Sequence, residues 1–172
     1  MGNQLSDAFC RRKSRQVHVL ILGLYAAGKT SLLYQCVLGR HVHTLPSLID
    51  NIETCKLNRS ELTVLDVGNR MKSRVFLRHH YSHLKGLVFV VDSTKRERVG
   101  AAKEYLEEFV NEEELKDFPI AIALHKRDLD NCITKEEMEE ILEVNTIQKQ
   151  RPCRVFLTTT FPNEEESISK TC

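Results

Sequence analysis

Short apolar runs alternate along the chain with amphipathic, charge-rich stretches. The runs at residues 17–23, 86–92 and 119–124 have the length and composition of strands buried in a sheet. Further strands are predicted at 52–57 and 62–67, joined by a turn at 58–60, and at 154–158. Helices are predicted at 29–38, at 97–114 and from 134 to about 144, the last opening with a capping box. This alternation predicts an α/β fold, a mainly parallel sheet with helices on both faces.

Composition narrows the class of protein. A chain of 172 residues without repeats or linkers predicts one domain. Lys and Arg number 25 against 24 Asp and Glu, a balance that argues against a strongly basic nucleic-acid-binding surface. The longest apolar run, residues 17–24, falls far short of the roughly 20 residues of a transmembrane helix. Six cysteines without a C-x-x-C pair indicate the reduced thiols of a cytoplasmic protein.

A phosphate-binding loop is predicted between the first strand and the first helix. The segment Gly23-Leu-Tyr-Ala-Ala-Gly28-Lys29-Thr30 matches G-x-x-x-x-G-K-[ST] in the required strand–loop–helix context. Backbone N–H groups at the helix N-terminus face phosphate oxygens, Lys29 bridges the β- and γ-phosphates, and the Thr30 hydroxyl ligates Mg²⁺. The predicted nucleotide-binding residues here are Gly23, Leu24, Tyr25, Ala26, Ala27, Gly28, Lys29, Thr30 and Ser31.

Two later segments indicate which nucleotide the loop binds. Asp66-Val67-Gly68 ends a predicted strand, where the carboxylate can hold Mg²⁺ through water and the glycine can face the γ-phosphate. His125-Lys126-Arg-Asp128 ends another, where Asp128 can accept hydrogen bonds from guanine N1 and N2. Ligands of α/β proteins bind at the carboxyl ends of the strands, so the three motifs together predict a guanine nucleotide with Mg²⁺.

With these motifs the chain resembles the small GTPases, most closely the ADP-ribosylation-factor (ARF) and ARF-like family. The residues that carry the resemblance are Gly23–Thr30, Leu32–Tyr34, Thr44–Ser47, Asn51–Glu53, Leu65–Gly68, Leu87–Thr94, Lys126 and Asp128. The resemblance implies a six-stranded sheet with five helices and two nucleotide-sensing switches. It implies a GTP-binding, membrane-associated switch in vesicle trafficking, monomeric, with effectors and exchange factors as partners. It also implies Ser47 as a second Mg²⁺ ligand and a switch II that begins with Asp66–Gly68. Asn69 is expected to bind the nucleotide, and Thr158–Thr160 lie in the loop near the guanine O6, with Thr159 as the binding residue.

The chain departs from the family pattern at catalytic positions. Asn69 and Arg70 stand where the family has a glycine and a water-orienting glutamine, which predicts impaired GTP hydrolysis. An arginine supplied in cis can instead stabilise the transition state, so the catalytic role of Arg70 stays open. Tyr25 adds bulk at the γ-phosphate, and His125 replaces an asparagine. A non-catalytic pseudo-GTPase that acts through interactions is therefore the alternative, and a P-loop kinase is disfavoured.

The two ends of the chain carry other signals. Residues 1–6 match M-G-x-x-x-[ST], which predicts N-myristoylation of Gly2, with Cys10 and the basic run 11–15 as a second membrane signal. We divide the chain into this N-terminal segment, 1–15, the GTPase domain, 16–160, and a polar tail, 161–172, in which the closing helix is shortened or absent. His79 and His83 have metal-ligand spacing, but an exposed basic helix face is the simpler interpretation.

Overall fold

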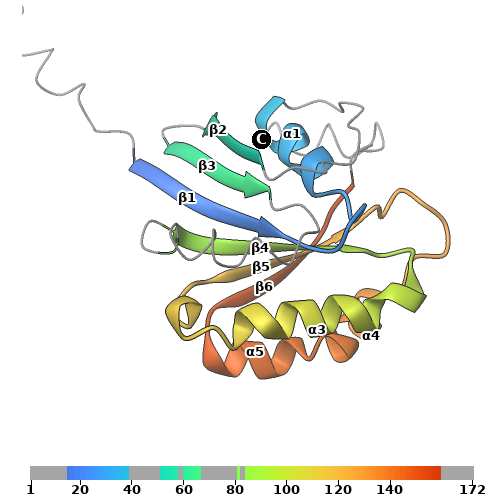
Figure 1. Ribbon diagram of the computed structural model, residues 1–172. Helices are drawn as coiled ribbons and strands as arrows, with labels where there is room; N and C mark the ends of the chain where they lie inside the picture. Colours follow the sequence, from blue (N-terminus) through green and yellow to red (C-terminus); the bar gives the residue numbers. More distant parts are fainter. Residues whose placement is uncertain (1–14, 39–50, 58–59, 67–80, 82–83, 160–172) are drawn as a thin grey trace, which may run out of the picture.

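A six-stranded sheet organises the molecule (Figure 1). The computed structural model describes residues 15–38, 51–57, 60–66, 81 and 84–159. The strands are β1 (Arg15–Leu22), β2 (Asn51–Leu57), β3 (Ser60–Asp66), β4 (Leu84–Asp92), β5 (Ile120–His125) and β6 (Cys153–Leu157). Their order is β2-β3-β1-β4-β5-β6, and every neighbouring pair is parallel except β2 with β3. The predicted α/β fold with a mainly parallel, six-stranded sheet is confirmed.

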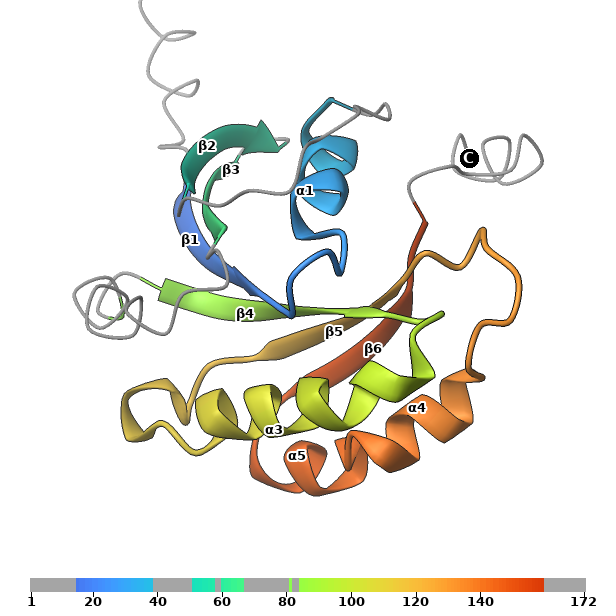
Figure 2. The same ribbon diagram turned by 45° about the vertical axis from the view of Figure 1, so that its right-hand side comes forward.

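Helices lie on both sides of this sheet (Figures 1 and 2). Helix α1 (Lys29–Leu38) lies on one side, and α3 (Val99–Val110), α4 (Lys135–Ile141) and α5 (Val144–Gln150) lie on the other. The larger core forms under these three helices, where buried residues such as Phe89, Ile122 and Met138 pack together. A smaller core, which includes Ile21 and Val90, packs beneath α1. The carboxyl-terminal halves of β4 and β5 are buried on both faces because helices lie over both faces there, as their continuous apolar runs indicated.

The predicted helices differ from the observed ones at their ends. The stretch predicted as one helix at 97–114 is a 3₁₀ turn, η1 (Arg96–Arg98), then α3, then a second turn, η2 (Glu113–Leu115), because Glu112 adopts an extended conformation. Thr134 caps α4 as predicted, accepting a hydrogen bond from the Glu137 amide at 3.2 Å. Glu143 then takes a left-handed conformation (φ 51°), which separates α4 from the unpredicted α5.

Several predictions fall on residues outside the described part of the chain. These are the lipidation site Gly2, the metal ligand Ser47, the residues Val67, Gly68, Asn69 and Arg70, the histidines 79 and 83, and the shortened closing helix. Within the described ranges, no group of three or more His, Cys, Asp or Glu side chains forms a metal site. No helix in those ranges has the length and apolar character needed to cross a membrane.

Candidate nucleotide-binding site

The loop from Gly23 to Gly28 makes a tight path from β1 to α1. Gly23 (φ 147°) and Gly28 (φ 98°) have backbone conformations that L side chains rarely adopt. A Cβ on Gly23 would lie only 2.3 Å from the Val90 carbonyl oxygen, so the loop needs glycine there to pack against β4. The Ala27 amide donates to the Leu24 carbonyl at 3.1 Å and closes the turn. The predicted glycine positions are therefore those that the loop geometry requires.

This loop presents hydrogen-bond donors to an anion. Among the described residues, none accepts a hydrogen bond from the backbone amides of Tyr25, Ala26 or Gly28. Helix α1 begins directly after them, and its first turn holds no acidic residue that would offset the positive end of its dipole. The buried Lys29 side chain turns back to the loop, with Nζ donating to the Gly23 carbonyl at 3.2 Å and to the Leu24 carbonyl at 3.4 Å. Amides, a helix N-terminus and a held cation form a cradle that suits a polyphosphate.

Lys126 ties this cradle to the ends of two neighbouring strands. Its Nζ donates to the Ala26 carbonyl at 2.9 Å and to Asp92 Oδ2 at 2.6 Å. Asp92 Oδ1 accepts from the Thr94 amide at 2.9 Å and from the Thr94 hydroxyl at 2.7 Å. Burial disfavours the Asp92 carboxylate, but hydrogen bonds from Lys126 and Thr94 outweigh it and hold the pKa of Asp92 below its usual value. Asp92 is therefore an ionised anchor that orients the lysine.

A buried imidazole stands directly against the phosphate loop. The His125 side chain is 1% exposed, and a Cβ on Gly28 would lie 2.3 Å from its Cδ2 and 2.8 Å from its Nε2. On the other side, Nδ1 lies 3.0 Å from Thr158 Oγ1. Burial lowers the pKa of His125 to about 4, a change that the nearby Asp128 opposes and Lys126 reinforces. At neutral pH the ring is uncharged, with one donor and one acceptor nitrogen.

The loops after β5 and β6 meet beside this imidazole. The Arg127 amide donates to the Thr158 carbonyl at 3.2 Å, and the Thr158 amide donates to the Leu124 carbonyl at 2.9 Å. The Thr159 hydroxyl donates to Asp128 Oδ1, so a carboxylate and a hydroxyl stand together at an exposed position. An ionised carboxylate has acceptor sites on both oxygens and can receive two neighbouring N–H groups, as guanine N1 and N2 require.

The structure therefore brings most of the predicted site residues to one end of the sheet, the end at which the parallel strands have their carboxyl termini. This end is called the nucleotide edge below. The phosphate loop with Lys29, Thr30 and Ser31 follows β1, His125 to Asp128 follow β5, and Thr159 follows β6. Asp66 ends β3 and pairs with Ile21, so its backbone lies at the same edge. Tyr25 is 39% exposed on the loop. The assignments of Ser47 and residues 67–70 stay predictions, because those residues lie outside the described ranges.

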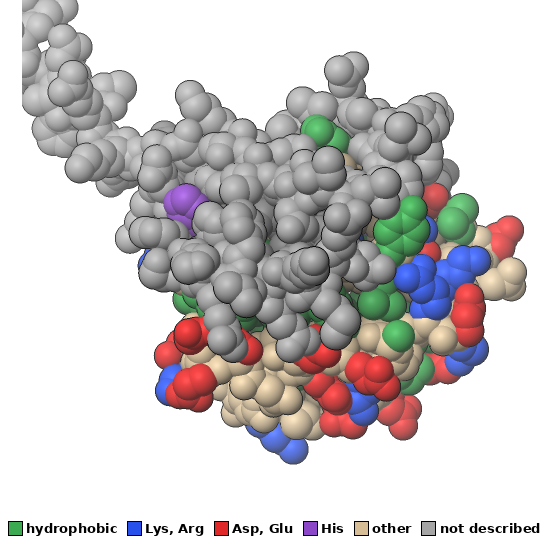
Figure 3. Space-filling model, viewed as in Figure 1, with side chains coloured by type: hydrophobic (Ala, Val, Ile, Leu, Met, Phe, Trp, Pro, Cys, Tyr) green, Lys and Arg blue, Asp and Glu red, His purple; other side chains and the backbone are tan. Residues whose placement is uncertain are grey.

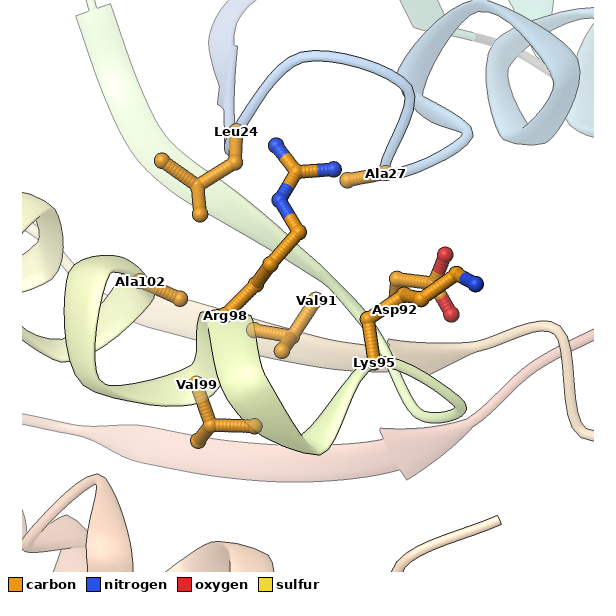
Figure 4. Close-up of a pocket in the computed structure, with 8 residues that line it drawn as sticks. All are labelled: Leu24, Ala27, Val91, Asp92, Lys95, Arg98, Val99 and Ala102. Carbon is orange, nitrogen blue, oxygen red and sulfur yellow. The ribbon is translucent and has the colours of Figure 1, made fainter. Parts of the chain in front are cut away.

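Other residues at this edge were not predicted to take part. Asp92 and Thr94 hold Lys126, and a signal for Asp92 existed, since it ends a buried strand. Thr158 lies in the loop that was predicted near the guanine, and its contact with His125 was not predicted. Arg98, from η1, points between Leu24 and Ala27 beside the loop, and nothing in the local pattern marked it (Figure 4). Leu24, Ala27, Asp92 and Arg98 are among the residues that line a pocket of about 10 Å³, room for one water molecule. This pocket is too small to hold a nucleotide.

Comparison with known proteins agrees with this geometry. Residues 4–169 match the model of the ADP-ribosylation factor family. Among solved structures, the fold resembles the Arl6 BBS3 small GTPase of Trypanosoma brucei, solved with the bound nucleotide analogue GppNp. The TM-score is 0.75 at 24% sequence identity, over 90% of this chain and 94% of that chain. Because the family match spans nearly the whole sequence, this chain belongs to the ADP-ribosylation factor family, a family of small GTP-binding switch proteins.

Proposed function

We propose that this protein binds GTP and GDP with Mg²⁺ at the edge of the sheet formed by the carboxyl ends of β1, β4, β5 and β6. The observation that carries the proposal is that two loops are joined. Lys126 bonds the phosphate loop at Ala26, and Asp128 beside it, whose Oδ1 accepts from Thr159, has a second carboxylate oxygen to receive a base. One site thus offers donors for phosphates and acceptors for guanine at fixed separation. This division of labour matches a purine nucleotide better than a lone phosphate.

Each part of the nucleotide has its residues in this proposal. The amides of the Gly23–Gly28 loop and the Lys29 ammonium contact the phosphates. Asp128 accepts from the guanine N–H groups, with Thr159 and His125 holding that loop. Thr30, at the second position of α1, and Ser47 supply hydroxyl oxygens of the kind that Mg²⁺ prefers, and Asp66 acts through water. When bound, the ion would neutralise phosphate charge.

We infer that the switch works at a membrane surface. Myristoylation of Gly2 together with the basic residues 11–15 would supply the two signals that stable peripheral attachment needs. The protein would then be cytoplasmic and peripheral, and monomeric in its nucleotide cycle. Its partners would be exchange factors and effectors of membrane trafficking, as expected of an ARF-like switch.

A second function, a pseudo-GTPase that acts only through interactions, is favoured by one set of residues. Asn69 and Arg70 remove the water-orienting glutamine. His125 stands at a position where the family has an asparagine, and its neutral ring lies against Gly28. The described residues keep the phosphate cradle of the Gly23–Gly28 loop and Lys29, and we therefore propose nucleotide binding ahead of efficient hydrolysis.

The nucleotide carried by the purified protein tests these functions. Mass spectrometry of the released nucleotide should find GTP for a slowly hydrolysing switch, GDP for an active GTPase and neither for a pseudo-GTPase that binds no nucleotide. In calorimetry, Lys29→Ala should weaken GTP binding roughly 10- to 100-fold, because it removes a charge-assisted phosphate contact. Lys149→Ala, an exposed lysine on α5, is the matched control and should bind as wild type does. Unchanged GTP affinity in Lys29→Ala would refute the phosphate-loop assignment.

A further inference from the structure

On the α1 side of the sheet, the side chains of β4 and β5 are buried near the carboxyl ends of the strands and become more exposed toward their amino ends. Val90 and Ala123 pair with each other and are 0% and 4% exposed, in the core beneath α1. One step back along the same face, Val88 pairs with Ala121, and both are only half-buried. Phe156, beside Ala123 on β6, is 47% exposed. An apolar sheet face therefore continues beyond the cover that α1 provides.

A groove of about 370 Å³ lies on this part of the face, within the roughly 300–1,000 Å³ of sites that take a specific ligand. Its floor is low because Gly86 and Ala121 carry little or no side chain, and Val19 and Phe156 rise on either side. A Cβ added at Gly86 would come no closer than 3.4 Å to any atom, so the floor has room. The shape allows the backbone of an occupant to approach closely.

Among the described residues, the charged side chains that line the groove, Lys85 and Arg154, are both basic. Both side chains are exposed, and neither forms a hydrogen bond or an ion pair within the described part of the chain. Two unpaired cations beside an apolar floor complement an apolar surface flanked by carboxylates.

We propose that this groove docks an amphipathic helix of a partner protein, with its apolar stripe on the floor and Asp or Glu beside Lys85 and Arg154. A helix fits because the groove lies on a sheet face, where the strand N–H and C=O groups are already paired. An added strand would need a free sheet edge, whereas a helix satisfies its own backbone. The occupant thus binds through side chains alone.

Other occupants fit this groove less well. The basic N-terminal run 11–15 would be repelled by Lys85 and Arg154. Residues 160–172 carry three glutamates, but their only large apolar side chains are Phe161 and Ile168, too few for the apolar floor. The groove also lies at the amino ends of β4, β5 and β6, opposite the nucleotide edge. Docking there is a function separate from nucleotide binding.

Calorimetry with the full chain and synthetic peptides tests the proposal. The probe is a helical peptide of about 18 residues, with leucines at 3.6-residue spacing flanked by glutamates, and its counterpart has lysine for each glutamate. The acidic peptide should bind the full chain, more weakly as salt rises, and the basic peptide should not. The double variant Lys85→Glu, Arg154→Glu should weaken binding at least about fivefold, because two attractions become repulsions. Ala121→Phe should abolish binding by filling the floor.

Lys149→Glu is the matched control, an exposed charge reversal on α5 on the other side of the sheet, and should leave peptide affinity unchanged. Thermal unfolding of each variant shows whether it is folded, and the charge reversals carry the test if Ala121→Phe is not. Equal binding of the acidic and basic peptides would overturn the proposal. So would binding that emerges only when residues 160–172 are removed, or self-association of the chain that Ala121→Phe abolishes, since either would name a different occupant.

Discussion

The His125 ring contacts two loops that are distant in sequence, the phosphate loop before α1 and the loop after β6. Gly28 lies against one edge of the imidazole, and the Thr158 hydroxyl lies 3.0 Å from Nδ1. An asparagine at this position would offer four hydrogen-bonding sites on a smaller side chain, whereas the neutral ring offers two. The histidine therefore braces the phosphate loop partly through packing, and its protonation would put a buried charge in that contact.

This burial predicts a pH dependence of stability. The pKa of His125 is about 4 in the folded protein, against an ordinary value of 6.5. Between these values the unfolded chain takes up a proton that the folded protein does not. The free energy of unfolding should therefore fall as pH decreases from about 6.5 to about 4, by on the order of 3 kcal/mol from this residue, and its contribution should be constant above pH 6.5.

Urea unfolding from about pH 7 to about pH 4.5 measures this effect. His125→Asn should show a flatter pH profile than wild type, because the other histidines are unchanged. Asp92 acts in a lower range. Its lowered pKa contributes stability above the ordinary value of 3.8, which is lost only as pH falls through the folded value. Parallel profiles for wild type and His125→Asn would show that His125 is not the titrating group.

At the scale of secondary-structure elements, the buried Arg151 links the ends of α3, η2 and α5. Arg151 follows α5 and is 6% exposed. One guanidinium nitrogen donates to the Leu115 carbonyl at 2.7 Å, and another donates to the Val110 carbonyl at 2.6 Å. Val110 ends α3 and Leu115 ends η2, so the side chain satisfies carbonyls that helix ends leave unpaired. Desolvation lowers the pKa of Arg151 from its usual value, an effect that Asp117 opposes.

Arg151→Met should lower the free energy of unfolding by about 2 kcal/mol. The methionine keeps much of the apolar stem but leaves two buried carbonyls without a donor, which outweighs the relief of burying a charge. Denaturant unfolding measures the difference, with Lys149→Met two residues earlier as the exposed control, expected within about 0.5 kcal/mol of wild type. Equal stability of the two variants would mean that water replaces the guanidinium at these carbonyls.

At the scale of the whole molecule, the site depends on the parallel sheet. Because β1, β4, β5 and β6 run in the same direction, their carboxyl ends place the phosphate loop, Asp92, Asp128 and Thr159 at one edge. Acidic and basic side chains are interspersed over the described helices in Figure 3, consistent with a net charge of +1.

Hydrolysis should be slower than in a typical family member. Asn69 and Arg70 lack the water-orienting glutamine, and losing one preorganised hydrogen-bonding group costs on the order of 10²–10³ in rate. In single-turnover assays with bound GTP, the double variant Asn69→Gly, Arg70→Gln should turn over at least about tenfold faster than wild type, a conservative part of that range. A wild-type rate equal to or above that of the variant would show that Arg70 replaces the glutamine.

Membrane attachment should depend on Gly2. Gly2→Ala cannot be N-myristoylated, so the variant should move from the membrane to the soluble fraction of cells, because the basic run alone gives weak attachment. Intact-mass measurement of the wild-type protein should show the added acyl group. Ala8→Gly, which leaves the acceptor glycine in place, is the control and should fractionate as wild type does. Membrane binding of Gly2→Ala equal to wild type would exclude the lipid anchor.

The local sequence predicted each strand and the phosphate loop, because both depend on neighbouring residues. Continuous apolar runs favour buried strands, and the loop needs glycine where its backbone takes φ values of 147° and 98°. Helix ends were less predictable. Glu143 interrupts the helical stretch after Thr134 in a left-handed conformation that glycine or asparagine usually adopts, so no local signal announced α5.

Only the tertiary structure decided how the site is held together. Lys126 bonds the Ala26 carbonyl across 100 positions of sequence, and His125 touches Gly28 across a similar separation. Such contacts follow from the strand order, which places β1, β4 and β5 side by side, and composition or spacing along the chain does not encode them. The sequence by itself determined which residues can bind phosphate and guanine. Packing determined that Lys126 and His125 join those two groups of residues, and that one apolar sheet face extends beyond α1.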